Sequence, residues 1–360
     1  MKLVVLGLSL SSSWGNGHAT TYRSLLRAFA GRGHEVLFLE RDVPWYQGRN
    51  RDLAEPDFCR LAFYDDLSDL DRFREDVAAA DAVVVGSYVP EGRAVGAWAQ
   101  EHARGVTAFY DIDTPVTVAA LERGDCAYLS PDLIPGFALY LSFTGGPMLG
   151  RLAEEFGSPG PRALYCCVDE GRYRPWTGEH RFDLSYLGTY SDDRQPVLER
   201  LLLEPARRAP ELRFCVAGPQ YPATIDWPAN VTRFEHVGPA DHPEFYGVSR
   251  FTLNVTRADM VRAGWSPSVR LFEAAACGTP IISDPWDGQG EIFRDGRDIL
   301  VARDGDAVLG VLTGMGEAER SALGAAGRAR VLEAHTASHR AAELEGYITE
   351  IARRSGASWS

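Results

Sequence analysis

The chain has 360 residues, of which 45% are hydrophobic and 24% charged, a composition typical of globular proteins with two or three domains. Its formal net charge of −13 argues against a nucleic-acid-binding or membrane-surface protein, because both need a basic surface. No segment reaches the ~18 consecutive apolar residues of a membrane span. The six cysteines lack CxxC pairs and zinc-type spacing, so we expect reduced thiols and a cytoplasmic location.

The first half of the chain alternates apolar runs with helical patterns. The opening run, residues 2–10, is interpreted as a core strand and not as a signal peptide, because a helix and a second strand follow it at once. Apolar periodicity and turn residues predict strands at 2–10, 35–39, 81–86 and 106–111, and helices at 20–31 and 92–103.

The second half repeats this alternation and ends in a helical tail. The predicted strands are residues 183–187, 213–217, 251–255 and 280–283, and the tail spans about 317–354. Strands that alternate with helices are typical of parallel, doubly wound sheets. We therefore expect an α/β fold made of two Rossmann-like domains that face a cleft.

Residues 262–284, RAGWSPSVRLFEAAACGTPIISD, form the most informative segment. Ser266 is predicted to cap a helix, Pro267 to occupy its first position, and Gly278 to end it before an apolar strand. The free backbone N–H groups of such a helix start favour a phosphate. The segment therefore indicates a nucleotide-binding site.

Three polar residues of this helix, Ser266, Arg270 and Glu273, fall on one stripe at i, i+4 and i+7. A carboxylate two turns into the helix could accept hydrogen bonds from ribose hydroxyls. The alternative is an ordinary amphipathic helix on which Arg270 and Glu273 form a surface ion pair.

Other polar residues collect where the predicted strands of the second half end, which is where parallel sheets bind ligands. Arg257 is the candidate for a diphosphate, because its fork matches phosphate oxygens and its charge could stabilise a leaving group. For Arg194 a solvated surface role is the alternative, and for Asn254 a merely exposed polar position. The candidate nucleotide-binding residues are Gly17, Thr189, Arg194, Gly218, Asn254, Arg257, Ser266, Ser268, Arg270 and Glu273.

The loop 11–23 is the conspicuous feature of the first half. Gly15 and Gly17 permit close backbone approach, but Thr20 stands where the third glycine of a dinucleotide fingerprint belongs. His18 lies at the predicted helix start, where it could act as a general base or as a structural hydrogen-bonding group.

Two carboxylates, Asp111 and Asp113, follow a predicted buried strand. Their spacing places them on one side of an extended chain, close enough to shift each other's pKa for acid–base work, although a turn before Pro115 would use the same residues. The catalytic candidates are His18, Asp111, Asp113 and Arg257. The candidates for contact with a second substrate are Trp14, Asn16, Trp45 and Tyr46, whose aromatic members could also simply close a cleft.

Residues 270–280 resemble the C-terminal-domain signature of GT-B glycosyltransferases. The longer segment 252–284 is similar to the CgeB-type (spore maturation protein-like) group of that superfamily. Residues 11–23, 109–117 and 163–176 resemble its glycine-rich N-terminal loop, an acceptor-side segment and the inter-domain hinge.

The resemblance implies that Glu273 binds the ribose of a nucleotide-sugar donor. Trp265 stands where many retaining members of the superfamily carry a second glutamate. This departure leaves the sugar contact, and the retaining or inverting outcome, open.

The resemblance implies a hexosyltransferase that moves a sugar from a nucleoside diphosphate sugar to a hydroxyl of a small-molecule or glycan acceptor, without a metal or a further cofactor. Asp111 and Asp113, as an Asp-Ile-Asp sequence, are the one place that argues against a metal-free enzyme. The expected domains are residues 1–168 for the acceptor, 169–338 for the donor, and 339–360 as a helix that crosses back to the first domain. The alternatives are a nucleotide-sugar epimerase or a non-catalytic nucleotide-sugar-binding module. A dinucleotide-dependent oxidoreductase is disfavoured by the incomplete glycine fingerprints. The base (UDP, dTDP or GDP), the sugar, the acceptor and the oligomeric state stay open.

Overall fold

The computed structural model describes residues 1–14 and 17–354, which form two compact units. One unit comprises Met1–Cys166 together with Ala337–Ser360, and the other comprises Cys167–Thr336. In the described part of the chain, no helix is both long enough and apolar enough to cross a bilayer.

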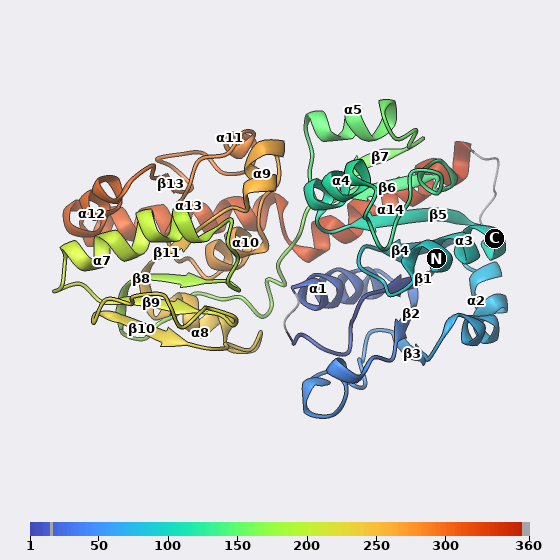
Figure 1. Cartoon of the computed structure of the whole chain (residues 1–360), viewed down its shortest axis with the longest axis horizontal. Coiled ribbons are helices and arrows are strands. Elements are labelled where there is room, and N and C mark those ends of the chain that lie inside the picture. The colour runs from blue at the N-terminus through green and yellow to red at the C-terminus, as the bar shows by residue number, and fades with distance from the viewer. Residues whose placement is uncertain (15–16, 355–360) are drawn as a thin grey trace. The chain divides into compact units, whose positions relative to one another are not determined.

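A seven-stranded parallel sheet forms the centre of the first unit (Figure 1). Its order is β3-β2-β1-β4-β5-β6-β7, where β1 is Lys2–Gly7, β2 Glu35–Arg41, β3 Arg60–Tyr64, β4 Ala82–Gly86, β5 Val106–Asp111, β6 Leu139–Ser142 and β7 Pro161–Ala163. The helices are α1 His18–Gly31, α2 Arg74–Ala78, α3 Gly92–His102, α4 Thr114–Arg123, α5 Pro147–Glu154 and α14 Ala337–Arg354. The last helix, α14, packs on α1, β5 and β6.

The central strands of this unit are buried on both faces, as parallel strands covered by helices should be. All five residues of β4 are buried, and Val5 of β1 pairs with Phe38 on one side and Val84 on the other. A Cβ on Gly86 would lie 2.0 Å from the hydroxyl oxygen of Tyr22. Glycine at this strand end therefore lets α1 pack close to the sheet.

The second unit contains a six-stranded parallel sheet of order β10-β9-β8-β11-β12-β13. Its strands are β8 Phe182–Leu187, β9 Phe214–Ala217, β10 Val231–Phe234, β11 Ser249–Asn254, β12 Ile281–Ser283 and β13 Leu300–Val301. Its helices are α6 Gln195–Leu198, α7 Glu204–Arg208, α8 His242–Gly247, α9 Ala258–Ala263, α10 Val269–Ala276, α11 Gln289–Ile292, α12 Gly305–Gly314 and α13 Glu317–Ala334, with a π-helical turn at Glu199–Leu203 between α6 and α7. A leucine-rich cluster that includes Leu201–Leu203 packs against β8, β9 and β11.

Two differences between the predicted and observed boundaries bear on the site. Strand β1 ends at Gly7 and not at residue 10, because residues 9–12 turn aside to bind a buried carboxylate described below. Helix α10 begins at Val269 with Ser268 as its N-cap, so Ser266 does not cap it. The predicted stop is confirmed, since Gly278 follows the helix with φ +70°.

Candidate functional site

Asn254 is the centre of a polar network at the carboxyl end of β11. Its side chain is fully buried, and its Nδ2 donates to Thr256 Oγ1 at 3.2 Å and Ser283 Oγ at 3.0 Å. Its Oδ1 accepts from Ser268 Oγ and Arg270 Nη1, both at 2.9 Å. Both donors and both acceptor positions of the amide are therefore used inside the protein, so Asn254 holds the start of α10 against the strand ends.

Arg270 links α10 to the end of β8. Its Nε donates to the carbonyl oxygen of Leu187 at 2.6 Å, and its guanidinium lies 4.8 Å from the ring centroid of Tyr186. The residue is only 7% exposed, yet Nη2 makes no hydrogen bond to a residue that the structure describes. A Cβ on Gly188 would lie 2.9 Å from this Nη2. One edge of the guanidinium is thus available beside the backbone that follows β8.

The backbone after β8 and the backbone after β9 touch each other at this point. Gly218 has φ +142°, and a Cβ on it would lie 2.0 Å from the carbonyl oxygen of Gly188, so only glycine fits. Arg194 donates from Nη2 to the carbonyl oxygen of Thr189 at 2.7 Å, and its buried Nε has no partner in the described part of the chain. The predicted residues Thr189, Arg194 and Gly218 therefore come together at the ends of β8 and β9.

Arg257 occupies the N-cap position of the short helix α9 and is about one-third exposed along its side chain. Its Nε lies 3.8 Å from Asp193 Oδ2, which also accepts the backbone N–H of Ala258 at 2.9 Å. Asp193 thus fixes the start of α9 and offsets part of the Arg257 charge.

Glu273 is buried in a cluster that sequence reasoning missed. Its Oε1 accepts from the hydroxyl of Tyr173 at 2.8 Å, and its Oε2 accepts from Tyr246 at 2.9 Å and lies 3.5 Å from His242 Nδ1. Burial alone would raise the pKa of Glu273, but His242 and the two hydroxyls outweigh it and lower the pKa below its ordinary value. A ribose would have to compete with these partners for the carboxylate.

A second buried acid, Asp284, follows β12. Its carboxylate accepts from the backbone N–H of Thr256 at 3.1 Å and from Thr256 Oγ1 at 2.9 Å. Burial raises the pKa of Asp284 to about 6, although these hydrogen bonds oppose the shift. Ser266, which was predicted to face a phosphate, is also buried.

In the first unit, His18 is the first residue of α1, and its ring packs edge-on against Tyr88 with centroids 5.2 Å apart. Its Nδ1 is buried and has no hydrogen-bond partner within residues 1–14 and 17–354. The hydroxyl of Tyr88 donates to Asp113 Oδ2 at 3.2 Å. Burial lowers the pKa of His18, and the nearby Asp113 charge acts in the opposite direction. The structure therefore brings His18 and Asp113 together, with Tyr88 as a partner that the sequence did not indicate.

Asp111 differs from Asp113, although both were expected to act on one side of the chain. Asp111 is fully buried, and its carboxylate accepts from Tyr140 at 2.6 Å, Thr117 at 2.8 Å and the backbone N–H of Asp113 at 3.2 Å. Burial raises the pKa of Asp111 to about 6. Asp113 instead occupies the N-cap position of α4 and is partly exposed.

The aromatic candidates for acceptor contact also differ in exposure. Trp14 is 49% exposed and Trp45 58%, whereas the ring of Tyr46 is buried and cannot offer a face to a ligand as expected. Asn16, like Gly15, lies outside the described residues. Gly17 is the N-cap of α1 with an ordinary φ of −78°.

Sequence reasoning also missed what holds the loop before α1. Glu40 is fully buried at the end of β2, and its Oε2 accepts the backbone N–H groups of Leu10 and Ser11 at 2.6 and 2.9 Å. Arg23 forms a two-pronged pair with Asp52, at 2.9 and 2.8 Å, and donates to the carbonyl oxygen of Leu10. No local sequence pattern marks these pairs, because their members lie about 30 residues apart.

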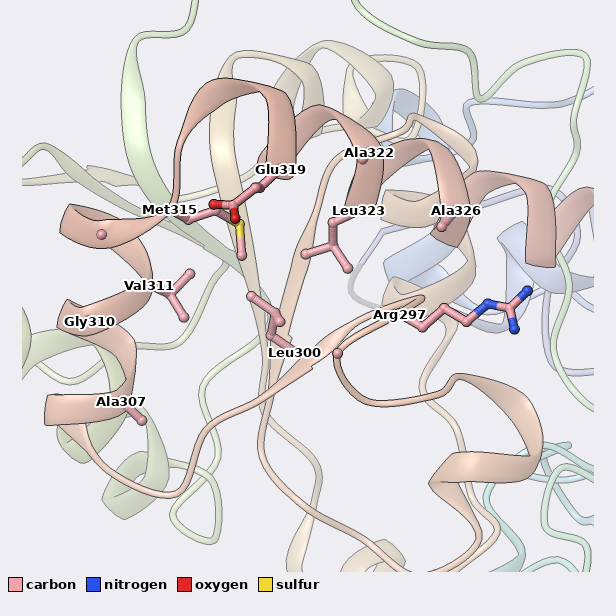
Figure 2. A pocket seen from close by; sticks show the side chains of 12 residues that line it. Arg297, Leu300, Ala307, Gly310, Val311, Met315, Glu319, Ala322, Leu323 and Ala326 are labelled. Carbon is pink, nitrogen blue, oxygen red and sulfur yellow. The ribbon is translucent and has the colours of Figure 1, made fainter.

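A cavity of about 760 Å³ lies in the second unit between α12, α13 and β13 (Figure 2). Figure 2 shows Leu300, Val311, Met315 and Leu323 pointing into it, with Glu319 at its rim. None of the predicted site residues lines this cavity.

Residues 194–346 match the protein family described as "Glycosyl transferase-like". No curated protein matches the chain. Solved structures with the same fold include sucrose-phosphate synthase from Thermosynechococcus elongatus (13% identity, 98% of this chain and 100% of that chain, TM-score 0.69) and HepE from Anabaena in complex with UDP-glucose (13%, 97% and 100%, TM-score 0.69). An alpha-glucosyltransferase in complex with UDP is similar as well (13%, 97% and 100%, TM-score 0.73).

These similarities confirm the predicted α/β fold of GT-B type, with two parallel sheets. The family match over residues 194–346 also supports the predicted glycosyltransferase domain.

Proposed function

We propose that the chain transfers a sugar from a nucleoside diphosphate sugar, bound by the second unit, to a hydroxyl of an acceptor bound by the first unit. The proposal rests mainly on the unpaired edge of the Arg270 guanidinium. Its side chain is buried, but Nη2 has no partner among the described residues and lies beside the crowded glycines at the ends of β8 and β9. A diphosphate oxygen supplies the acceptor that this edge lacks.

Two further arginines belong to the loop that follows β8 or contact it. Arg194 donates to the carbonyl oxygen of Thr189, next to Gly188, and Arg257 Nε lies 3.8 Å from Asp193 Oδ2. Arginine charge and the positive end of α10 stabilise the leaving nucleoside diphosphate as its negative charge develops. The proposal therefore needs neither a metal nor a cofactor besides the nucleotide sugar.

In the first unit, we assign proton removal from the acceptor hydroxyl to His18. A general base must be neutral before it accepts a proton. Because burial lowers the pKa of His18 below its ordinary value of 6.5, the imidazole stays neutral at a lower pH than a free histidine does. Asp113 favours the imidazolium that forms, and the exposed Trp14 and Trp45 supply acceptor contacts. A small molecule or glycan suits this acceptor role, since a net charge of −13 disfavours a nucleic acid.

Two finer assignments rest on the sequence. Residues 252–284 support placing the chain with the CgeB-type group. The six free thiols support a reducing compartment such as the cytoplasm.

The first experiment is a thermal-shift panel of UDP-, dTDP- and GDP-sugars, with NAD and NADP as controls. A ligand at ~100 times its dissociation constant stabilises the folded state by roughly 2.7 kcal/mol. We expect one nucleotide sugar to raise the melting temperature and the dinucleotides to leave it unchanged. If no nucleotide sugar raises the melting temperature, the proposal is overturned.

Product analysis then separates the alternatives. A transferase forms a glycosylated product only when an acceptor is supplied, an epimerase converts the donor alone, and a binding module converts nothing.

A further inference from the structure

The chain turns after β4 in the first unit, and Tyr88 occupies this turn in a conformation that tyrosine rarely adopts. Tyr88 has φ +63°, and Glu91, three residues later, has φ +53°. A positive φ is an outlier for a residue as bulky as tyrosine. Such conformations persist where the surrounding structure enforces them, and they cluster at functional sites.

The backbone just before Tyr88 is fastened to the end of β5. The N–H of Ser87 donates to the carbonyl oxygen of Tyr110 at 3.0 Å, and the fully buried Ser87 Oγ accepts from the N–H of Ile112 at 3.2 Å. The turn after β4 is therefore held against the segment that leads from β5 to Asp113.

The side chain of Tyr88 contacts both residues that are assigned to proton removal. Its ring lies edge-on to the ring of His18, with centroids 5.2 Å apart and an interplanar angle of 78°. Its hydroxyl donates to Asp113 Oδ2 at 3.2 Å. The ring also packs on Tyr128, with centroids 4.6 Å apart. Tyr88 thus connects the first residue of α1 to the N-cap of α4.

The hydroxyl of Tyr88 keeps its proton near neutral pH. Burial raises the pKa of Tyr88, and the charges of Asp113 and Asp111 raise it further. Burial lowers the pKa of His18, and Asp113 is the charged group that opposes this effect. Because a hydrogen bond to a carboxylate stabilises its charge, the Tyr88 hydroxyl moderates the action of Asp113 on His18.

We propose that Tyr88 is a positioning residue for the base of the acceptor side, an inference that rests on the proposed function. Its ring fixes the orientation of the His18 imidazole, and its hydroxyl fixes the carboxylate of Asp113, which favours the imidazolium. The unusual φ of Tyr88 places one side chain in contact with both groups, which come from α1 and α4.

NMR titration of the histidines in the full-length chain tests the proposal without an acceptor. The chain has eight histidines, so the signal of His18 is identified by its absence in His18→Ala. Tyr88→Phe keeps the ring and removes the hydroxyl. Tyr22→Phe is the matched control, because Tyr22 also lies on α1 and its buried hydroxyl has no hydrogen-bond partner in residues 1–14 and 17–354.

We expect the pKa of His18 to rise in Tyr88→Phe, since Asp113 no longer shares its charge with a donor, and to stay unchanged in Tyr22→Phe. Asp113→Asn should lower the pKa of His18 more in the Tyr88→Phe background than in the unsubstituted chain. An unchanged pKa of His18 in Tyr88→Phe, or an equal rise in Tyr22→Phe, overturns the positioning role and leaves the proposed function in place.

Turnover, measured with an acceptor found by product analysis, gives the second test. Tyr88→Phe should lower kcat about tenfold, leave the KM for the donor unchanged and move the acidic limb of the rate profile to higher pH. Equal kcat and an unmoved limb would contradict the proposal. If no nucleotide sugar binds the unsubstituted chain, the proposed function fails and the catalytic meaning of Tyr88 fails with it, whatever the titration shows.

Discussion

The carboxyl ends of β5 and β11 are built alike, although they belong to different units. Each strand ends in a fully buried polar residue, Asp111 or Asn254, whose hydrogen-bonding atoms are taken up by the protein. The accessible group follows a few residues later, as Asp113 in the first unit and Arg257 in the second. In both units the polar residue at the strand end is therefore an anchor for the loop, and the more exposed polar group lies beyond it.

The two anchors differ in how they respond to pH. Asn254 is a neutral amide, whereas Asp111 is an acid whose pKa burial raises to about 6. The first unit therefore has a strand-end anchor that changes its charge near neutral pH, and the second has one that does not. In the second unit the buried acid, Asp284, stands beside the anchor.

The largest expected effect is on turnover, and it concerns His18 and Asp113 in the first unit. His18→Ala is expected to lower turnover on the order of 100 to 10,000-fold with donor affinity unchanged, because the base is lost. The acidic limb of the rate profile should lie below the ordinary histidine pKa of 6.5 and disappear in this variant. Asp113→Asn should shift that limb, and Asp111→Asn should leave it in place. If turnover falls only in Asp111→Asn, the comparison between the two strand ends fails, because the buried Asp111 would then be the base.

The second prediction concerns the stability of the anchor. The pKa of Asp111 rises from 3.8 to about 6 on folding, so its contribution to stability is fully present below pH 4 and is lost as the pH rises to about 6. At roughly 1.4 kcal/mol per pKa unit, the free energy of unfolding falls by about 2 to 3 kcal/mol over this range. Asp111→Asn mimics the protonated acid and should flatten that decline in denaturant titrations. Asn254→Asp should introduce a new decline in the second unit. An unchanged pH profile in Asp111→Asn would show that the anchor does not titrate as expected.

The third prediction concerns Glu273, whose role the sequence and the contacts describe differently. Glu273→Gln leaves both tyrosine hydroxyls without a charged acceptor and places an NH2 donor opposite one of them, so the free energy of unfolding should fall by about 2 kcal/mol at pH 7. Because the folded pKa of Glu273 lies below 4.5, its contribution is present above that pH and is lost as the pH falls.

Tyr246→Phe is the matched variant for Glu273, since it removes one hydroxyl and keeps the carboxylate. If Glu273 binds the ribose of the donor, Glu273→Gln should lower the affinity for the donor and Tyr246→Phe should leave that affinity unchanged. If both variants bind the donor as tightly as the unsubstituted chain does but are less stable, Glu273 is a structural residue.

The smallest expected effect concerns Arg257→Lys. Lysine keeps the charge but loses the fork, so turnover should fall about tenfold while the melting temperature changes little. Arg194→Lys is the comparison, because the Nη2 of Arg194 already binds the carbonyl oxygen of Thr189 and its replacement should cost more stability. If Arg257→Lys retains full turnover and full affinity for the nucleoside diphosphate, Arg257 does not bind the diphosphate.

Most central strands were predictable because burial on both faces leaves a continuous apolar run in the sequence, but the four-residue β6 was too short to stand out. The predicted strand 106–111 agrees with β5 at both ends, and the helix predicted at 92–103 differs from α3 by one residue. The strands β3, β6, β7, β10 and β13 were missed. They are short or lie at sheet edges, where exposed residues such as Arg60 and Thr232 remove the apolar pattern.

The amino-acid sequence by itself determined the alternation of strands and helices, the helix-to-strand unit within 262–284 and the polar residues at the strand ends, because periodicity, caps and spacing are local properties. Only the tertiary structure decided which of those polar residues are anchors. The partners of Glu273 come from positions 173, 242 and 246, and those of Asp111 include Tyr140, 29 residues away. Burial and hydrogen-bond saturation depend on such distant segments, and no local pattern records them.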